Sequence, residues 1–362
     1  MKVKQLPISD PSNLGQKILE LYSESRAIIE AKTEGKDVEK TVFIPIAHAS
    51  FGSELKLEST ETTDDEIRKQ LESGSPQYSQ LEPDDKERKQ IDAFATKVVE
   101  RRRHWLRDAL LASGLIDPSY SILGRIGIAF PGKVTLAKDF QPKHYLYVFD
   151  TNVFARHLIS NYLRLRLSQS TMKDILVATP PAVIWELEEI ANRRVDEEET
   201  RIARSAFRDV AYMESSMKVQ LIPAKGADTE TVLSDRLIRR QVREFKWNPL
   251  AVLKTEEVST EAKVFVTFDR VSALAAQAEG LVCCSLDVPV EQGSWTLNPV
   301  DAQSREDALG SFFAELSVLR GTIRVRSGAK PEFYVLGDWP GKANHEWIKG
   351  QIRHEVGTLG AR

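Results

Sequence analysis

The stretch Tyr145-Leu146-Tyr147-Val148-Phe149-Asp150-Thr151-Asn152-Val153-Phe154 decides the fold. It opens with β-branched and aromatic residues, which are typical of a strand, and this run stops on Asp150. Apolar residues at helical spacing follow at once, so a helix is expected directly after the acid. A strand that ends just before a helix places its last residues at the carboxyl edge of a sheet, where open α/β sheets bind ligands. We therefore expect Asp150 to lie at the centre of a functional site.

Strand-like and helix-like patterns alternate from His144 to about Leu286. After the strand that ends at Asp150, further strands are expected at 174–178, 218–222, 263–267 and 281–284. Helices are expected at 153–167, 183–193, 198–216, 231–245 and 271–278, the last one closing at Gly280. This alternation predicts a parallel central sheet with right-handed crossovers.

The flanking regions have a different texture. Residues 1–142 are expected to form a mostly helical accessory region, with helices over 12–32 and 83–114 and a flexible acidic segment at 58–79. Residues 289–362 are expected to form a small α+β region. Its elements are a helix over 302–320, a β-hairpin of 322–326 with 332–336, and a final helix that contains Trp347, Ile348 and Ile352.

The composition is that of an ordinary globular protein, with 362 residues, 41% hydrophobic residues and a formal net charge of −3. No overall basic field exists, so any affinity for nucleic acid must come from local patches. The first residues have no apolar signal-peptide core, and no run of about 18 apolar residues predicts a membrane span. Cys283 and Cys284 are adjacent in a predicted strand, which disfavours a disulfide between them. We expect a cytoplasmic protein that does not associate with a membrane.

Four acids stand at matching junctions of the predicted α/β region. Asp150 ends the first strand, Glu186 lies in the first turns of the helix after the second strand, Asp235 begins a later helix, and Asp269 follows the fourth strand. In a parallel sheet these junctions share one edge. Carboxylates gathered there raise one another's pKa unless a cation is present, and the hard ions Mg²⁺ and Mn²⁺ prefer oxygen ligands. Such a site suits hydrolysis of a phosphodiester bond.

The residues alone leave alternatives open at each position. Asp269 and Asp235 stand where an acid caps a helix, which is a structural role. Glu188 and Glu189 compete with Glu186, and Asp228 competes with Asp235. On the predicted helix at 83–114, the run Arg101-Arg102-Arg103 is either a contact for nucleic-acid phosphates or a solvated helix face.

Residues 143–288 resemble a PIN domain, the Rossmann-like fold of many metal-dependent ribonucleases. Val148-Phe149-Asp150-Thr151-Asn152 is similar to the first motif of that family, and Pro181-Ala182-Val183-Ile184-Trp185-Glu186-Leu187 is similar to the second. Asp235-Arg236-Leu237-Ile238 is similar to the third, and Val266-Thr267-Phe268-Asp269 to the fourth. The chain departs from the family at Phe268, where an Asn is common.

The resemblance implies a metal-dependent endoribonuclease that cleaves mainly single-stranded RNA. Asp150, Glu186, Asp235 and Asp269 would then be the catalytic residues and the ligands of Mg²⁺ or Mn²⁺. Thr151, Asn152 and Thr267 would orient these ligands or a phosphate oxygen. The candidate contacts for RNA are Arg156, Arg236, Arg239, Arg240, Arg101, Arg102 and Arg103.

Two other functions are consistent with the same residues. One is a toxin or host-defence nuclease that a regulatory protein partner holds in check, and the other is a non-catalytic scaffold that binds RNA or protein. The amphipathic helix around Ile202 to Met213 adds a homodimer to the expectations.

Overall fold

The structure is a computed structural model, and the chain divides into two compact units. We call Leu111–Pro289 with Gly341–Ile348 the parallel unit, and Met1–Leu110 with Val290–Pro340 and Lys349–Arg362 the antiparallel unit. The structure describes residues 6–8, 11–32, 43–52, 54–61, 63, 65–67, 69, 85–123, 145–164, 167, 169–192, 197–222, 235–245, 263–297, 305–328, 330–337 and 352–357.

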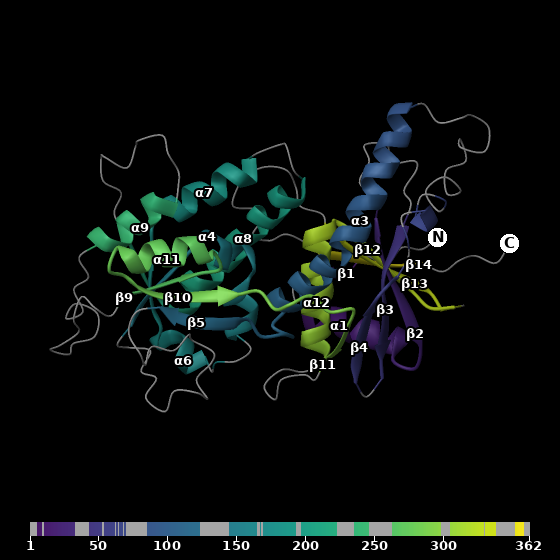
Figure 1. Cartoon of the computed structure of the whole chain (residues 1–362). Coiled ribbons are helices and arrows are strands. Elements are labelled where there is room, and N and C mark those ends of the chain that lie inside the picture. Colours follow the sequence, from purple (N-terminus) through teal and green to yellow (C-terminus); the bar gives the residue numbers. More distant parts are fainter. Residues whose placement is uncertain are drawn as a thin grey trace. The chain divides into compact units, whose positions relative to one another are not determined.

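The parallel unit contains a sheet with the strand order β5-β10-β9-β6-β7-β8, of which β5, β9 and β10 are labelled in Figure 1. Its strands are β5 (Ser119–Leu123), β6 (Leu146–Phe149), β7 (Leu176–Thr179), β8 (Lys218–Leu221), β9 (Lys263–Thr267) and β10 (Val282–Asp287). β5 pairs antiparallel with β10, and all the other pairings are parallel. The expected parallel sheet is therefore confirmed. The chain runs outward from β6 through β7 to β8 and then returns to β9 on the other side of β6, so the strand order reverses between β6 and β9.

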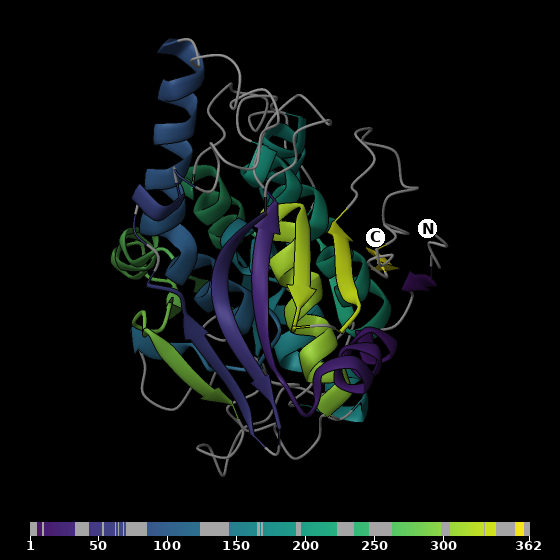
Figure 2. The same ribbon diagram turned by 90° about the vertical axis from the view of Figure 1, so that its right-hand side faces the viewer.

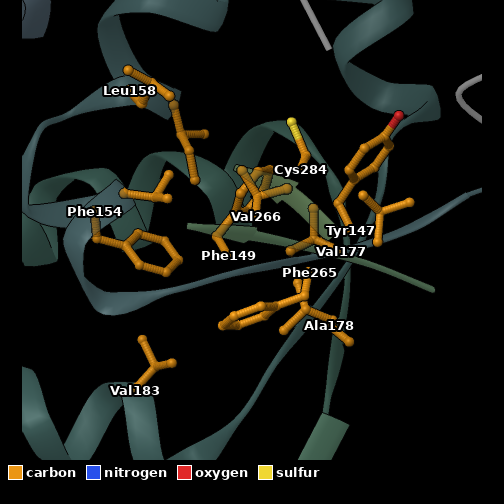
Figure 3. Packing of buried hydrophobic residues seen from close by; sticks show 14 of the residues in the cluster. Tyr147, Phe149, Phe154, Leu158, Val177, Ala178, Val183, Phe265, Val266 and Cys284 are labelled. Carbon is orange, nitrogen blue, oxygen red and sulfur yellow. The ribbon is translucent and has the colours of Figure 1, made fainter. Parts of the chain in front are cut away.

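Buried apolar residues fill both faces of this sheet. Every residue of β6, β7 and β9 is buried, as expected where helices cover both faces of a parallel sheet. On one face, the ring of Tyr147 stacks on that of Phe149, which meets Phe154 edge to face, and Phe265 of β9 lies on the other face (Figure 3). The described helices of the unit are α4 (Thr151–Ala155), the π-helix η4 (Leu158–Leu163), α6 (Gln169–Asp174), α7 (Pro181–Asn192), α8 (Glu197–Ser216), α9 (Asp235–Glu244) and α11 (Arg270–Ala278).

The helix expected over 153–167 is interrupted. α4 ends at Ala155, and His157 takes a left-handed conformation with φ of 49° before η4 begins. Among the described residues, His157 alone has a positive φ without being a glycine. Apolar spacing continues across this break, because Leu158, Ile159 and Tyr162 are all buried, and that is why periodicity predicted one helix. α11 ends as expected, with Gly280 in the positive-φ region at 83°.

The antiparallel unit contains a second sheet with the strand order β1-β14-β13-β12-β2-β3-β4-β11. Its strands are β1 (Leu6–Ile8), β2 (Arg26–Lys32), β3 (Phe43–Phe51), β4 (Leu55–Ser59), β11 (Ser294–Leu297), β12 (Thr322–Arg326), β13 (Glu332–Gly337) and β14 (Ile352–Gly357). The expected hairpin of β12 and β13 is confirmed. β2 pairs with β12, so both ends of the chain build one sheet, and Figure 2 shows the purple and blue N-terminal strands in the same sheet as the yellow C-terminal ones.

Two predictions for the flanking regions are wrong. The helix expected over 12–32 ends at Tyr22, and the remainder forms β2, in which Ala27, Ile29 and Ala31 face the core with a period of two. The described part of the N-terminal region therefore combines helices with the strands β1 to β5. Ile352, expected in a final helix, begins β14, while Trp347 and Ile348 lie outside the described residues. Most of the segment at 58–79 also lies outside them.

Helices α1 (Pro11–Tyr22) and α12 (Arg305–Arg320) pack against each other in the antiparallel unit. Gly15 of α1 approaches the backbone of Glu306 so closely that a Cβ atom would lie 1.7 Å from the Glu306 carbonyl oxygen. Tyr22 ends α1, and its hydroxyl donates to the carbonyl of Val325 in β12 at 2.9 Å. A third helix, α3 (Asp85–Ala112), is the longest in the described part of the chain, and none of the helices described there is apolar enough over a sufficient length to cross a membrane.

Candidate functional site

Asp150 lies at the reversal point of the parallel sheet. It directly follows β6, and its N–H donates to the carbonyl of Val266 in β9 at 3.0 Å. Its Oδ1 accepts a hydrogen bond from the N–H of Thr151 at 2.9 Å, so Asp150 is the N-cap of α4. The residue is only 2% exposed. A buried carboxylate therefore lies between two strand ends, where open α/β sheets generally bind their ligands.

Polar side chains from both strand ends converge on the second oxygen of Asp150. The Thr267 hydroxyl donates to Asp150 Oδ2 at 2.6 Å, and Asn152 Nδ2 donates to the same oxygen at 3.0 Å. Asn152 also accepts the N–H of Phe268 on its Oδ1 at 2.9 Å. Asn152 thus ties the start of α4 to the end of β9, and the three side chains form one hydrogen-bonded group.

Burial raises the pKa of Asp150 to about 7, and the charges of Asp235 and Glu186 act in the same direction. The hydrogen bonds from Thr267 and Thr151 oppose this rise. Two of the other predicted acids therefore lie near enough to Asp150 to repel its charge. Near neutral pH the site is poised between a neutral and an ionised carboxyl.

Glu186 reaches the site from α7. Its Oε2 accepts the hydroxyl hydrogen of Thr151 at 2.6 Å, whereas Glu188 and Glu189 are exposed. The start of α7 is fixed by α9, because the N–H of Ala182 donates to Gln241 Oε1 at 3.1 Å. Asp235 is the first residue of α9, and the competing Asp228 lies outside the described residues.

Asp269 is engaged in a helix cap. Its Oδ1 accepts the N–H groups of Val271 at 2.7 Å and Ser272 at 3.1 Å, which satisfies the first turn of α11. Its own N–H donates to the Thr267 hydroxyl at 2.9 Å, and that hydroxyl is bonded to Asp150. The structure therefore links Asp269 to Asp150 through one threonine and shows the capping role as well.

The donor types around Asp150 suit Mg²⁺ or Mn²⁺, because carboxylate, hydroxyl and amide oxygens are the ligands that hard cations prefer. Within the described ranges, however, no three or more His, Cys, Asp or Glu side chains are grouped closely enough to hold a metal ion. The carboxylates of Asp150, Glu186 and Asp235 would have to draw together around a bound ion.

The predicted RNA-contacting arginines differ in their surroundings. Arg239 is buried and donates to Glu279 at 3.1 Å and to Ser272 at 3.1 Å, so it joins α9 to α11 and is not placed for RNA. Arg102 is buried too, whereas Arg101 and Arg103 are exposed on α3 within the antiparallel unit. The remaining three belong to the parallel unit and are Arg156, Arg236 and Arg240.

Sequence reasoning missed the buried side chains that position the elements. Gln241 caps α7, and Lys263 caps the carboxyl end of α9 by donating to the carbonyls of Val242, Arg243 and Phe245. Asp209 accepts the N–H of Ile159 at 3.1 Å at the start of η4. An acid at position 209, beside the apolar stripe of α8, was a signal for such a role, but Gln241 offers none because its partner is distant in sequence.

The apolar face of α8 is also used inside the parallel unit. Ala206, Val210 and Met213 are buried in the unit's own core, and α8 packs on α7 and α4. These three residues are therefore covered within the unit, and a homodimer stays a prediction.

Comparison with known proteins assigns no family. No protein-family model and no curated protein matches the sequence. Among solved structures, the chain is similar to a domain of a functionally unknown protein from Methanocaldococcus jannaschii DSM 2661. That match has 18% sequence identity and a TM-score of 0.29, and it covers 41% of this chain and 95% of the other.

Proposed function

We propose that the parallel unit is a PIN-like, Mg²⁺- or Mn²⁺-dependent endoribonuclease that hydrolyses phosphodiester bonds of single-stranded RNA. One observation carries the proposal: the Asp150 carboxyl is buried where the strand order reverses, and Glu186 and Asp235 lie near enough to raise its pKa. Like charges gathered in a buried place are costly unless a cation or a proton joins them. The motifs around Asp150 and Asp269 support the choice of a nuclease.

Each residue then has a role that follows from its contacts. Asp150, Glu186 and Asp235 would hold the ion, and Asp269 would complete the set through the carboxylate oxygen that does not cap α11. The ion would supply a water of lowered pKa and stabilise negative charge on the phosphate. Asn152 and Thr267 hold the Asp150 carboxyl in one orientation, and Thr151 does the same for Glu186.

The test is cleavage of labelled single-stranded RNA by the full chain with Mn²⁺ or with EDTA. EDTA should abolish cleavage, and Asp150→Asn should lower the rate at least about 100-fold, because losing even a residue that only orients a metal ligand costs about 10–100-fold. Glu188→Gln is the matched control, because Glu188 is exposed on the same helix as Glu186 and should leave the rate unchanged. Cleavage that persists in EDTA, or an unimpaired Asp150→Asn protein, would exclude this function.

A second candidate is a non-catalytic scaffold, which one observation favours. Both oxygens of Asp150 accept hydrogen bonds from the protein, and Asp269 caps a helix. Both acids therefore have a structural role that needs no metal ion. Calorimetric titration with Mn²⁺ separates the candidates. A nuclease should bind the ion in the wild type and lose this binding in Asp150→Asn, whereas a scaffold should show the same heat in both proteins.

A further inference from the structure

Arg156 and Phe268 form a cation–π pair near Asp150. The guanidinium carbon of Arg156 lies over the ring of Phe268, 5.0 Å from its centroid. Phe268 is connected to the site through its backbone, since its N–H donates to Asn152, which in turn donates to Asp150. Both residues of the pair are partly exposed. Two hydrogen bonds, through Asn152, therefore connect the backbone of Phe268 to the buried carboxyl of Asp150, and Arg156 lies over the Phe268 ring.

The backbone after α4 determines where Arg156 lies. Arg156 is the C-cap of α4, and its N–H donates to the carbonyl of Phe154. The next residue, His157, has the unusual φ of 49°, which ends α4 after five residues and separates Arg156 from η4. A left-handed conformation costs on the order of 1 kcal/mol for a residue with a side chain, so other contacts must maintain it.

The imidazole of His157 supplies those contacts. His157 is 1% exposed, its Nε2 lies 2.7 Å from the Ser205 hydroxyl, and its Nδ1 lies 3.1 Å from an Arg208 nitrogen. Arg208 can only donate, so Nδ1 is the acceptor, and a neutral ring then donates from Nε2 to Ser205. The Ser205 hydroxyl passes its own hydrogen to the carbonyl of Ile202. α8 thus holds the strained turn that presents Arg156.

The surface next to this pair is unusual for the parallel unit. Val271 is 76% exposed and Leu274 is 50% exposed, both on α11, which begins two residues after Phe268. They are the only large hydrophobic residues of the described parallel unit with such exposure. Arg270, also exposed, opens the same helix. We call Arg156, Phe268, Arg270, Val271 and Leu274 the rim of the site. The rim combines an aromatic ring, apolar side chains and cationic side chains.

We propose that Arg156 and Phe268 bind a base of single-stranded RNA by stacking, next to the phosphate that reaches Asp150. The proposal deepens the proposed function and rests on it. The Phe268 ring supports the guanidinium plane, whose opposite face stacks on a base, as Arg planes commonly do in complexes with unpaired nucleotides. Phe268, where the resembling family commonly has Asn, is then the residue that makes this stacking site.

The test measures binding without catalysis. The full chain in EDTA is titrated into a short single-stranded RNA that carries one fluorescent aminopurine base, whose emission changes when it stacks. Arg156→Lys keeps the charge and loses the plane, and Phe268→Leu keeps the apolar bulk and loses the ring. Each should weaken binding about tenfold, which is typical for the loss of one stacking contact, and should remove the fluorescence change. Arg243→Lys is the matched control and should bind like the wild type, because Arg243 is exposed at the carboxyl end of α9, where it pairs with Glu279.

Three results would overturn the stacking site. The first is that Arg156→Lys binds the RNA with wild-type affinity, and the second is that Phe268→Leu still shows the full fluorescence change of the wild type. The third is that the wild type does not bind this RNA, which would assign the surface to a protein partner. Circular dichroism spectra of the variants that match the wild type exclude unfolding as the cause of any loss. Cleavage of RNA in Mn²⁺ is measured in a separate experiment. If the RNA stacks but is not cleaved, the nuclease function is excluded and the stacking site is retained.

Discussion

At the scale of single residues, the Asp150 carboxyl depends on two separate elements, because it accepts hydrogen bonds from Thr267 at the end of β9 and from Asn152 in α4. Asp150 directly follows a strand, as expected, because a strand run that stops on an acid is a local pattern. Glu186 was distinguished from Glu188 and Glu189 only by the structure, in which Thr151 donates to Glu186. Gln241 could not be found in the sequence at all, since its role depends on the N–H of Ala182 in another helix. A local sequence pattern can therefore identify the acid at the end of a strand, whereas the side chains that position the site depend on tertiary contacts.

The raised pKa of Asp150 predicts how stability depends on pH in the absence of metal. Its pKa is about 7 in the folded protein and 3.8 in the reference state, so the folded state binds the proton more tightly. The stabilising effect of that proton is complete below about pH 4 and is lost as the pH rises through 7, by about 4 kcal/mol in all. In Asp150→Asn this loss should be absent. The two free energies of unfolding, measured in EDTA from pH 4 to 8, should diverge with rising pH, and parallel curves would contradict the burial argument.

At the scale of elements, the strands of the parallel sheet were predicted well, whereas β2 and the start of β14 in the antiparallel unit were predicted as helix. Strands buried on both faces give short, continuous apolar runs between helices, so β6 to β10 were recognisable. In β2, the pair Ile28 and Ile29 continued the helical spacing of α1, and one of its two pairing partners, β12, lies near the other end of the chain. The break at His157 was equally hidden, because apolar spacing persists across it.

The close contact of α1 with α12 predicts that replacing Gly15 with Ala destabilises the protein. Gly15→Ala would gain about 0.5–1 kcal/mol of helix propensity, but the new Cβ would lie 1.7 Å from the Glu306 carbonyl oxygen, and overpacking of this kind costs about 1–3 kcal/mol. The clash should dominate, and thermal unfolding should occur several degrees lower. Gly52→Ala is the control, because a Cβ there meets only the Ser50 hydroxyl oxygen at 3.9 Å. Equal melting temperatures for the two variants would contradict the packing described.

At the scale of the whole molecule, the antiparallel unit is discontinuous in sequence. β2, β3 and β4 come from the first part of the chain, while β12 and β13 come from the last part, and the whole parallel unit except 341–348 lies between them. Periodicity cannot reveal such an arrangement, because it reports the local structure of a segment and not its partner. The flanking regions were therefore expected as separate additions, although they share one sheet and one core.

This arrangement predicts the effect of a shortened chain. A protein ending at Pro289 would retain the strands of the parallel sheet and lose α12 with β11 to β14. Leu14 and Ile18 of α1, now fully buried, would lose their cover on α12. Such a chain should bind the dye ANS strongly, and a protease should cleave its first 60 residues well before the remainder. If the protease cleaves the first 60 residues of the shortened chain no faster than those of the full chain, the folding of β2 does not depend on β12.

The pairing of β2 with β12 has a further consequence during synthesis on the ribosome. At 5–20 residues per second, β2 waits roughly 15 to 60 seconds for β12 to be made. Throughout that time one edge of β2 has no permanent neighbour, and unpaired edges invite association with other chains. Arg26 and Lys32 at the two ends of β2 are charged, which discourages such association. The parallel unit, in contrast, has all its strands once Asp287 is added, so its sheet can form first and the two ends of the nascent protein join last.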